Sequence, residues 1–597
     1  MTPQTAVRFR RLLLSYLLRY RWRYLPGFFA LLGASLVVMV PPLVLRHAID
    51  AIAEGSTGSR LAAYGAMILG LAIVESLMRF AARHLVSGTS RRVEYDLRND
   101  LAAHLMRLDQ RFYVASQTGD LMARATNDLQ VVRDLVGPTL LDLGRTAAMM
   151  LFGVAFLLSI NVRLALVSIA YLPLIAFLVI YFQSTIEGKY RAVQDQFGKL
   201  TTHAQENISG IRTIKAYAQE ETEIASFARA NQEMMRRSMS WAYYTAGFWP
   251  LMTVAAGAST AVVLWFGGHD VVAGRITIGQ FVQFNAYLFL LAQPMLSLGW
   301  TFTTLQQGIA SMKRITEVLS TEPLIKDPAA PAPLTVVRGD IEFQDVTFRH
   351  GDIPVLSRIN LKIPAGSTVA LVGGTGAGKT SLVSLLVRLY DPTEGRVLLD
   401  GVDVRDLPLE QLRAAVGFVP QETFLFSEPL KENISYARAN PSQEEMTYAI
   451  ETSQLVTDLP QLTHGLDTVI GERGVTLSGG QKQRAALARA LIKNAPVVVL
   501  DDALSHVDTH TEEEILRRLG TFMADRTTIL IAHRTSTLAG ADFIVALEDG
   551  TIAEVGTHEE LLQKEGVYAR FFRRQLLAEQ IQDDAEVTTA SNGGSRS

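Results

Sequence analysis

The hydrophobic pattern divides this chain into an apolar first half and a mixed second half. Long uncharged runs are concentrated in about the first 320 residues, where six stretches approach the roughly 20 residues that a helix needs to cross a bilayer. These stretches are residues 26–45, 61–80, 142–160, 164–182, 242–267 and 276–300. Because so much continuous apolar surface would aggregate in water, the pattern predicts an all-α membrane domain of six helices over residues 1–320.

Basic residues predict how these spans are oriented. The connection at 86–145 contains eight Arg and the one at 183–240 contains eight Arg or Lys, whereas the short connections at 46–60, 161–163 and 268–275 contain four in all. Since basic residues stay on the cytoplasmic side, both long connections are expected there. An even number of spans then keeps the N-terminus and the second half cytoplasmic, which predicts a multi-pass protein of the inner (cytoplasmic) membrane.

The two long connections, with coupling loops at 86–141 and 183–241, keep a helical pattern. Apolar residues recur in them at helical spacing, so we expect the helices to continue into the cytoplasm. Their turns, near Phe112–Gly119 and Gly210–Tyr217, are expected to touch the domain formed by the second half of the chain. Residues 8–23 carry six Arg and predict an amphipathic helix ahead of the first span.

Polar residues within the spans allow two interpretations. Glu75 and Arg79 lie one helical turn apart and can pair, either at the membrane interface or in the wall of a translocation cavity. Asn285, Gln293 and Pro294 in the sixth span suit a cavity or polar packing between helices. None of these residues indicates a substrate.

The second half begins with a linker at 321–338, which contains four prolines, and continues as an α/β domain over 339–577. Residues 367–374 predict a buried strand that enters the sequence GGTGAGKT, and helical periodicity follows it. Strand, glycine-rich loop and helix together predict a P-loop that cradles phosphates with its backbone N–H groups. The expected nucleotide-binding residues are Gly373, Gly374, Thr375, Gly376, Ala377, Gly378, Lys379, Thr380 and Ser381. Lys379 would contact the β/γ-phosphates, and the Thr380 hydroxyl would bind Mg²⁺.

Two acids follow the next buried strand, VVVLDD at 497–502. Asp501 is placed to hold Mg²⁺, directly or through water, and Asp502 would face the attacking water. His533 closes the later strand TTILIA and is expected to contact the γ-phosphate, since ligands bind at the carboxyl ends of such strands.

With these motifs in order, and with LSGGQ at 477–481, nearly the whole chain resembles a half-transporter of the ABC exporter family: a six-helix membrane domain followed by a P-loop ABC ATPase domain. The resemblance implies that Gln421 is the Q-loop glutamine, which joins the catalytic and Mg²⁺ residues. It also implies that residues 471–474 (GERG) touch the coupling helices, that 505–508 (SHVD) form the D-loop, and that His533 is the switch histidine. In that family two chains sandwich ATP, so the signature residues would serve the nucleotide of the partner chain. These residues are Ser478, Gly479, Gly480 and Gln481.

The chain departs from the family pattern at three positions. Asp502 stands where the family usually has Glu, His350 where an aromatic Tyr usually stacks on adenine, and His506 where the D-loop is usually small. An altered catalytic acid beside an intact signature motif is typical of one half of a heterodimer with unequal ATP sites. A homodimer that uses Asp502 as the base, and an ATP-gated regulatory or channel-type protein, remain alternatives.

Composition limits the other possibilities. The net charge of −3 gives no reason to expect a nucleic-acid partner, and the absence of cysteine excludes disulfides and thiolate metal sites. The polar segment at 578–597 is typical of a disordered tail. Expected partners are a second half-transporter chain, the lipid bilayer and a transported substrate of unknown chemistry, with ATP and Mg²⁺ as cofactors.

Overall fold

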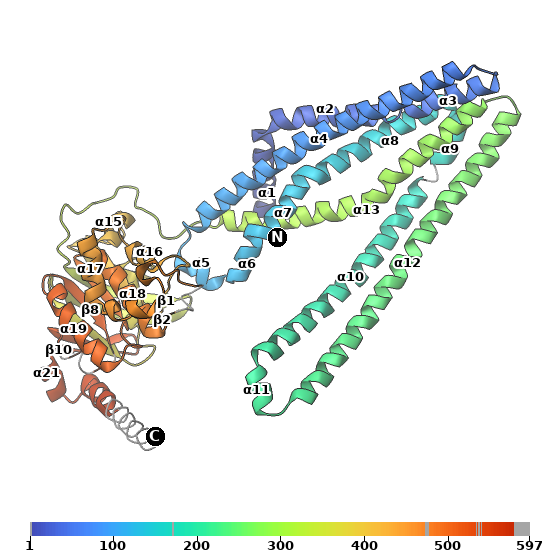
Figure 1. Ribbon diagram of the computed structural model, residues 1–597. Coiled ribbons are helices and arrows are strands. Elements are labelled where there is room, and N and C mark those ends of the chain that lie inside the picture. The colour runs from blue at the N-terminus through green and yellow to red at the C-terminus, as the bar shows by residue number, and fades with distance from the viewer. Residues whose placement is uncertain are drawn as a thin grey trace. The chain divides into compact units, whose positions relative to one another are not determined.

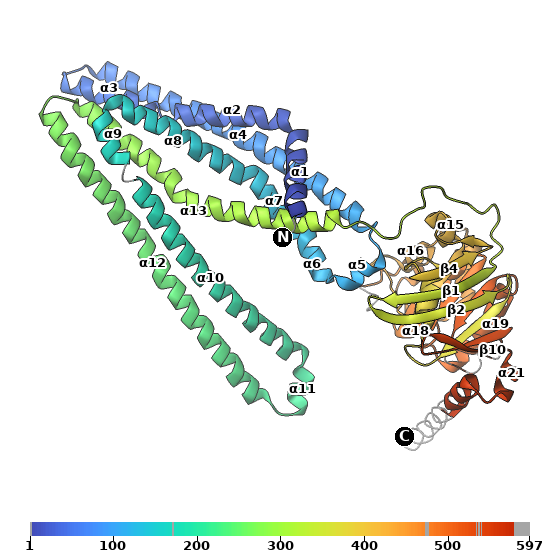
Figure 2. The same cartoon turned by 180° about the vertical axis from the view of Figure 1, so that it is seen from behind.

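The computed structural model describes residues 3–169, 172–471, 477–532, 534, 538 and 540–577. The chain forms two compact units (Figures 1 and 2), of which the first comprises Met1–Arg107 and Ser116–Glu322, and the second comprises Leu108–Ala115 and Pro323–Ser597. The predicted tail at 578–597 lies outside the described residues.

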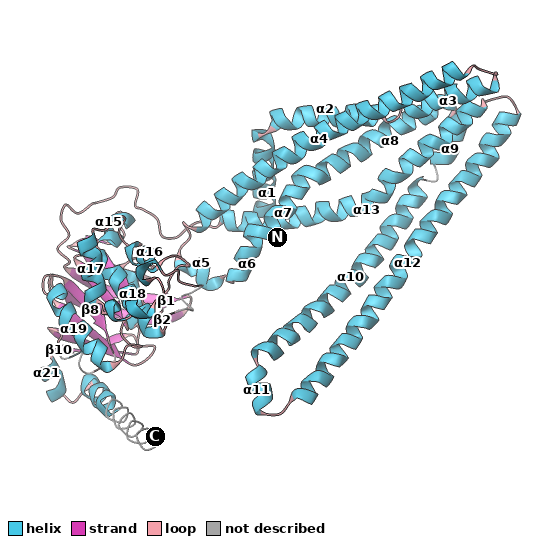
Figure 3. Ribbon diagram, in the orientation of Figure 1, coloured by secondary structure: helices cyan, strands magenta, loops and turns pink. Residues whose placement is uncertain are grey.

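Helices are the regular secondary structure of the described part of the first unit, and short loops join them (Figure 3). Its elements are α1 (Pro3–Arg19), α2 (Arg21–Val37), α3 (Pro41–Ala53), α4 (Gly58–Leu105), α6 (Thr118–Ala123), η1 (Arg124–Asp128), α7 (Leu129–Asp134), η2 (Leu135–Thr139), α8 (Leu140–Ile160), α9 (Val162–Ile169), α10 (Leu172–Ser209), α11 (Ile211–Ala216), α12 (Glu220–Val272) and α13 (Ile278–Ser320). η1 and η2 are π-helical turns within one continuous rod.

Within the described residues, four helical segments are long and apolar enough to cross a membrane: Arg21–Ala53, Gly58–Leu105, Thr118–Ile160 and Ile278–Ser320. The predicted first span at 26–45 lies within the helical segment Arg21–Ala53, whose regular hydrogen bonding is interrupted at residues 38–40 between α2 and α3. Pro41 and Pro42 begin α3 and lack the N–H groups that a continuous helix would use, so the chain turns at residues 38–40. The predicted fourth span, 164–182, includes residues 170–171, which lie outside the described residues.

The packing of the first unit centres on α13. Phe284, Tyr287 and Leu291 are fully buried against side chains that include Met149 and Leu157 of α8. The Tyr287 hydroxyl donates to the backbone oxygen of Met39, 2.8 Å away at the turn between α2 and α3. The same tyrosine therefore fills the core and satisfies a carbonyl that the turn leaves free.

The start of α13 is held by α3. The Asp50 carboxylate accepts hydrogen bonds from the Gly279 backbone N–H and the Thr277 hydroxyl, both at 3.0 Å. Thr277 and Gln280 also form a capping box. Free N–H groups in the first helical turn are thus paired with a negative charge, which the helix dipole favours.

The second unit contains two sheets. The four-stranded sheet has the order β2-β1-β4-β5, and the six-stranded sheet has the order β10-β9-β3-β8-β7-β6. Strands run over β1 (Ile341–His350), β2 (Ile353–Ile363), β3 (Thr368–Gly373), β4 (Glu394–Leu399), β5 (Val402–Asp403), β6 (Val416–Val419), β7 (Val497–Asp501), β8 (Thr527–Ile531), β9 (Phe543–Glu548) and β10 (Thr551–Gly556). Strands β9, β3, β8, β7 and β6 are parallel, so their carboxyl ends share one edge.

Helices cover the larger sheet. They are α14 (Lys379–Leu386), α15 (Leu409–Ala414), α16 (Leu430–Ser435), α17 (Gln443–Thr452), α18 (Gly479–Ile492), α19 (Thr509–Met523) and α21 (His558–Gln563). One core cluster joins α14 to both sheets, and a second joins α18 to β7. Strand β7 is buried along its whole length, which fixes the position of the acid at its end.

One segment belongs to a different unit from the one the sequence predicts. Residues Leu108–Ala115, which include α5 (Gln110–Ala115), group with the nucleotide-binding unit although they lie in the first long connection. The Asp109 carboxylate accepts a hydrogen bond from the Leu324 backbone N–H at 2.8 Å. The physical reason is that this turn makes its contacts with the second unit, whereas the helices on either side of it pack in the first.

Candidate nucleotide-binding site

The phosphate loop lies between β3 and α14 at the carboxyl edge of the six-stranded sheet. Gly373 and Gly378 have φ angles of 153° and 96°. A Cβ at Gly373 would lie 2.3 Å from the Leu547 backbone oxygen, and one at Gly378 would lie 2.6 Å from the Leu356 side chain. Glycine is therefore required at both positions by backbone conformation and by space.

Lys379 is the first residue of α14 and is almost completely buried. Its Nζ donates to the backbone oxygens of Gly373 and Gly374 at 2.9 and 3.0 Å. Burial lowers the pKa of the Lys379 ammonium, while the charges of Asp501 and Asp502 act in the opposite direction. A cation taken out of water in this way has much to gain from a phosphate oxygen.

Asp501 ends β7 and is paired with Ile531 of the neighbouring strand β8. On its other side, Ile531 is paired with Leu371 of β3. This register brings the acid to the edge where the phosphate loop starts. Burial raises the pKa of Asp501, and the nearby Thr380 side chain acts in the opposite direction. Its Oδ2 is buried and has no hydrogen-bond partner among the described residues.

This orphaned oxygen bears on the Mg²⁺ prediction. Buried carboxylate oxygens are normally paired, and carboxylate and hydroxyl oxygens are the ligands that Mg²⁺ prefers. The Thr380 side chain lies close enough to Asp501 to lower the pKa of its carboxyl, so one cation can meet both. The residues present therefore fit a magnesium ion.

Asp502 follows in the left-handed region, with φ of 50°, and its N–H donates to the Ile531 carbonyl at 2.9 Å. The Gln421 amide donates to Asp502 Oδ2 at 3.4 Å, which is longer than the usual ~2.9 Å. The structure thus brings together Lys379, Thr380, Gln421 and the two acids in one site.

The signature residues form a second group. Ser478 caps α18, and its hydroxyl accepts from the Gln481 N–H at 3.2 Å while the Gln481 side chain accepts from the Ser478 N–H at 3.0 Å. A Cβ at Gly480 would lie 2.8 Å from the His506 backbone oxygen. The D-loop therefore packs directly on the signature glycines and leaves no room for a side chain at Gly480.

Gln483 was not predicted from the sequence as a site residue. Its amide nitrogen lies 2.9 Å from Ser505 Oγ and 3.0 Å from His506 Nδ1, and its oxygen accepts from the His506 N–H at 2.8 Å. It thus joins the signature helix to the D-loop. The only sequence signal is a polar residue on the buried face of α18.

His350 ends β1 beside Tyr390, with ring centroids 6.0 Å apart. Tyr390 is therefore a second aromatic group at the predicted adenine position, and no motif marks it.

The phosphate loop also borders a cavity of about 460 Å³ that Arg570 and Arg574 line. These two cations were likewise not predicted from the sequence.

Some predicted residues cannot be placed. His533 and residues 472–474 of the GERG sequence lie outside the described residues. Their roles remain predictions.

Comparisons with known proteins identify relatives of both units. Residues 25–295 match the family of ABC transporter transmembrane regions, and residues 356–505 match the ABC transporter family of ATP-binding domains. The chain is 35% identical over 580 residues to the multidrug resistance-like ATP-binding protein MdlA of Escherichia coli, covering 96% of this chain and 98% of that protein. It is 33% identical over 509 residues to an ATP-dependent lipid A-core flippase of Desulfotalea psychrophila, covering 85% and 89% respectively.

Among solved structures, a bacterial Atm1-family ABC exporter with ATP bound is similar over the length of both units. The TM-score is 0.78 at 29% identity, and the match covers 93% of this chain and 98% of that one.

Proposed function

The chain belongs to the ABC transporter family as an exporter half-transporter, and from this premise we propose that it is the slow-site subunit of a heterodimer. Its fused membrane and ATPase domains make it an ATP-driven exporter whose ATP hydrolysis is coupled to transport. Half-transporters of this family act as dimers in a membrane. The observation that carries the proposal is Asp502, an acid one methylene short, beside an intact LSGGQ.

The short side chain of Asp502 changes the position of the catalytic carboxylate. A glutamate at this position would carry its carboxylate about 1.5 Å farther from the backbone, and a misplacement of about 1 Å can cost on the order of a hundredfold in rate. The backbone of Asp502 is held by its bond to Ile531, so it has little freedom to compensate. The site of this chain would then bind ATP and turn it over slowly.

The signature motif supports the second half of the proposal. Ser478 and Gly480 keep their positions at the start of α18, where helix N–H groups and the helix dipole favour an anion. Presented to a partner, LSGGQ would complete that chain's site, where the partner supplies the glutamate. ATP binding in both sites would close the dimer, and hydrolysis in one would reset it.

We assign each candidate site residue of this chain a part in nucleotide binding. Lys379 and the loop N–H groups would hold the phosphates, and Thr380, Asp501 and Gln421 would hold Mg²⁺, which when bound would neutralise charge at the phosphates. Asp502 would accept the proton of the attacking water and His350 would pack against adenine, while the γ-phosphate contact of His533 remains a prediction. In the membrane, both long connections lie on the cytoplasmic side of the inner membrane.

The test is the ATPase activity of the purified chain alone, native and as Asp502→Glu, with Lys379→Ala as the blank. We expect the native chain to be near the blank and Asp502→Glu to gain about a hundredfold, because the longer acid reaches the attacking water. Brisk turnover by the native chain would contradict the proposal, since Asp502 would then suffice as base in a homodimer.

A second measurement separates an exporter from an ATP-gated channel. The relatives are named for drugs and for lipid A, so these two classes are the first substrates to try with the Asp502→Glu chain. Stimulation of its ATPase activity by either class supports coupled export. A rate that no compound of either class changes, together with ATP-dependent ion conductance, would support gating instead.

A further inference from the structure

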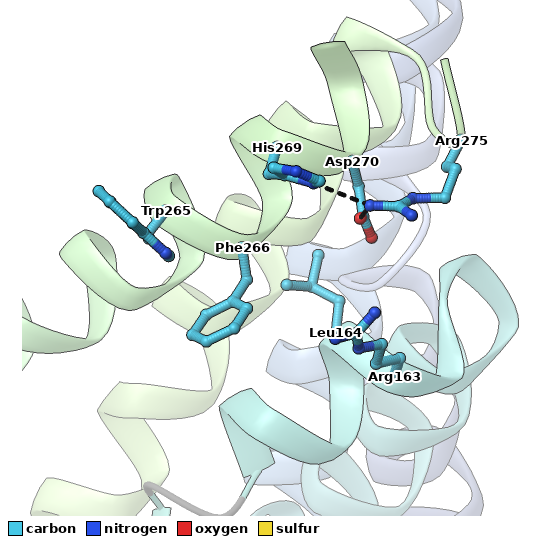
Figure 4. A pocket seen from close by; sticks show the side chains of 7 residues that line it. All are labelled: Arg163, Leu164, Trp265, Phe266, His269, Asp270 and Arg275. Carbon is cyan, nitrogen blue, oxygen red and sulfur yellow. Dashed lines mark hydrogen bonds and ion pairs between the residues drawn. The ribbon is translucent and has the colours of Figure 1, made fainter. Parts of the chain in front are cut away.

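A small cavity lies at the end of the first unit where α8 meets α9 and α12 meets α13. It has a volume of about 240 Å³, and the residues around it include Arg163 and Leu164 of α9 and Trp265, Phe266 and His269 of α12 (Figure 4). Arg275, in the connection to α13, closes one side. This volume is below the roughly 300–1,000 Å³ that encloses a drug-sized molecule, so the cavity suits a headgroup rather than a whole amphiphile.

The acid in this cavity is already neutralised. Asp270 is buried, with one carboxylate oxygen 2.5 Å from the Arg275 guanidinium and the other accepting from the Asn161 amide at 3.1 Å. Asn161 also accepts from the Leu164 N–H at 3.1 Å. Asp270 therefore joins the connection after α8 to the connection after α12, and Arg275 neutralises its negative charge.

His269 presents a donor to the cavity. An Arg275 guanidinium nitrogen lies 2.9 Å from His269 Nδ1, and a guanidinium can only donate. Nδ1 is therefore the acceptor, which places the proton of the neutral ring on Nε2. Nε2 is then the donor of a side chain that lines the cavity.

Arg163 supplies an uncompensated charge. Neither an ion pair nor a side-chain hydrogen bond joins it to any of the described residues, and Figure 4 shows it beside Leu164 on α9. With Asp270 and Arg275 cancelling, the cavity carries a net charge of about +1 and several N–H donors. Such a set binds a phosphate or carboxylate anion.

The surroundings of the cavity are apolar. Trp265 is 79% exposed, and Leu264 and Leu166 beside it are also exposed. These residues lie at the ends of uncharged runs, and exposed Trp at such a position is typical of the membrane interface. Acyl chains can cover this face while a headgroup enters the cavity.

From these observations we infer that the cavity binds the phosphate of an anionic phospholipid in the outer leaflet of the membrane. The inference rests on the proposed orientation, in which the short connections at 161–163 and 268–275 lie outside. Arg163 binds the phosphate oxygens, His269 Nε2–H donates to them, and Trp265 lies along the chains.

The test measures lipid binding to the purified full chain in detergent by native mass spectrometry. Phosphatidylglycerol is titrated against wild type, Arg163→Gln, Arg163→Lys and Arg60→Gln. Arg60 is the matched control, because it is exposed in another short connection and forms no ion pair with the described residues. We expect Arg163→Gln to weaken the tightest phosphatidylglycerol site about tenfold, Arg163→Lys to restore part of it, and Arg60→Gln to leave it unchanged.

Three results would overturn the inference. The first is equal binding by wild type and Arg163→Gln, and the second is an equal affinity for phosphatidylcholine. The third is displacement of the lipid by inorganic phosphate at millimolar concentration, which would identify a site for free anions.

Sidedness is tested separately. The chain has no cysteine, so Arg163→Cys carries the single thiol. Labelling of intact cells by a membrane-impermeant maleimide supports the outer-leaflet assignment, and labelling only from the cytoplasmic side overturns it. Neither readout involves ATP, so failure here leaves the ATPase proposal standing, and failure of that proposal leaves the lipid site standing.

Discussion

At the scale of single residues, Asp501 is a candidate Mg²⁺ ligand whose buried charge lowers the stability of the folded protein. Burial raises its pKa, so the folded protein holds the proton more tightly than the unfolded chain does. The stabilisation from protonation is complete below the ordinary value of 3.8 and is lost as pH rises through the raised folded pKa. At neutral pH the buried charge therefore opposes folding.

We predict that Asp501→Asn raises the thermal unfolding temperature at pH 7.5 by about 2–4 °C, the shift that ~1 kcal/mol gives in a domain of this size. Asparagine removes the charge and can still accept from Thr380. The gain should shrink as pH falls toward 4, because the wild-type carboxyl becomes protonated. Differential scanning fluorimetry without nucleotide measures both effects.

Asp508 is the control, because folding lowers its pKa whereas folding raises the pKa of Asp501. It caps α19 by accepting from the Thr511 N–H at 2.9 Å, and that backbone bond lowers its pKa. The stabilisation it provides is present above the unfolded pKa and is lost as pH falls through the folded one, so Asp508→Ala should lower the unfolding temperature at pH 7.5. If Asp501→Asn were no more stable than wild type at any pH, the buried charge would not be the cost we assign to it.

At the scale of elements, α13 depends on α3 for its first turn. A Cβ at Gly279 would lie 2.4 Å from the Arg46 backbone oxygen and 2.5 Å from the Asp50 carboxylate. The backbone oxygen is fixed within α3, so a methyl group has to push the two helices apart and weaken both bonds from Asp50.

We predict that Gly279→Ala destabilises the full chain by about 1–3 kcal/mol, as overpacking of a tight contact usually does. Gly70→Ala on α4 is the matched control, because a Cβ there meets nothing within 4 Å. Thermal unfolding of both variants in the same detergent makes the comparison. Equal unfolding temperatures would show that the start of α13 moves freely.

The elements also show what a sequence pattern can predict. Strand β3, the loop and the start of α14 lie where the motif predicts them, because hydrophobic period and glycine spacing are local signals. The local irregularity at residues 38–40 within the first span follows from Pro41 and Pro42 and was not predicted. The contact of Asp50 with Gly279 joins positions 229 apart and leaves no local signal.

The residues of the candidate site likewise divide into those that local sequence signals predict and those that they do not. Lys379, Thr380 and Asp501 were predicted because each stands in a motif with a known geometry. Gln483, Tyr390 and Arg574 were not, since ordinary residue types become part of a site only through folding. Asp501 Oδ2 could be recognised as unpartnered only once the strands were assembled.

At the scale of the whole molecule, the orientation of the spans is open to a direct test. Since the chain has no cysteine, Ser59→Cys and Thr118→Cys each introduce the only thiol, and both positions are exposed. With an impermeant maleimide on intact cells, we predict labelling at residue 59 and none at residue 118 until the membrane is opened. The reverse pattern would contradict the orientation that the basic residues predict.

The grouping of Leu108–Ala115 with the second unit has a practical consequence for expression. The polypeptide passes between the units at residues 107–108, 115–116 and 322–323, so the second unit is not one uninterrupted stretch of sequence. A gene fragment that starts at residue 323 encodes a protein without the Asp109 carboxylate, and the Leu324 N–H then faces solvent. A soluble version of the ATPase should therefore carry residues 108–115 as a fused or added peptide.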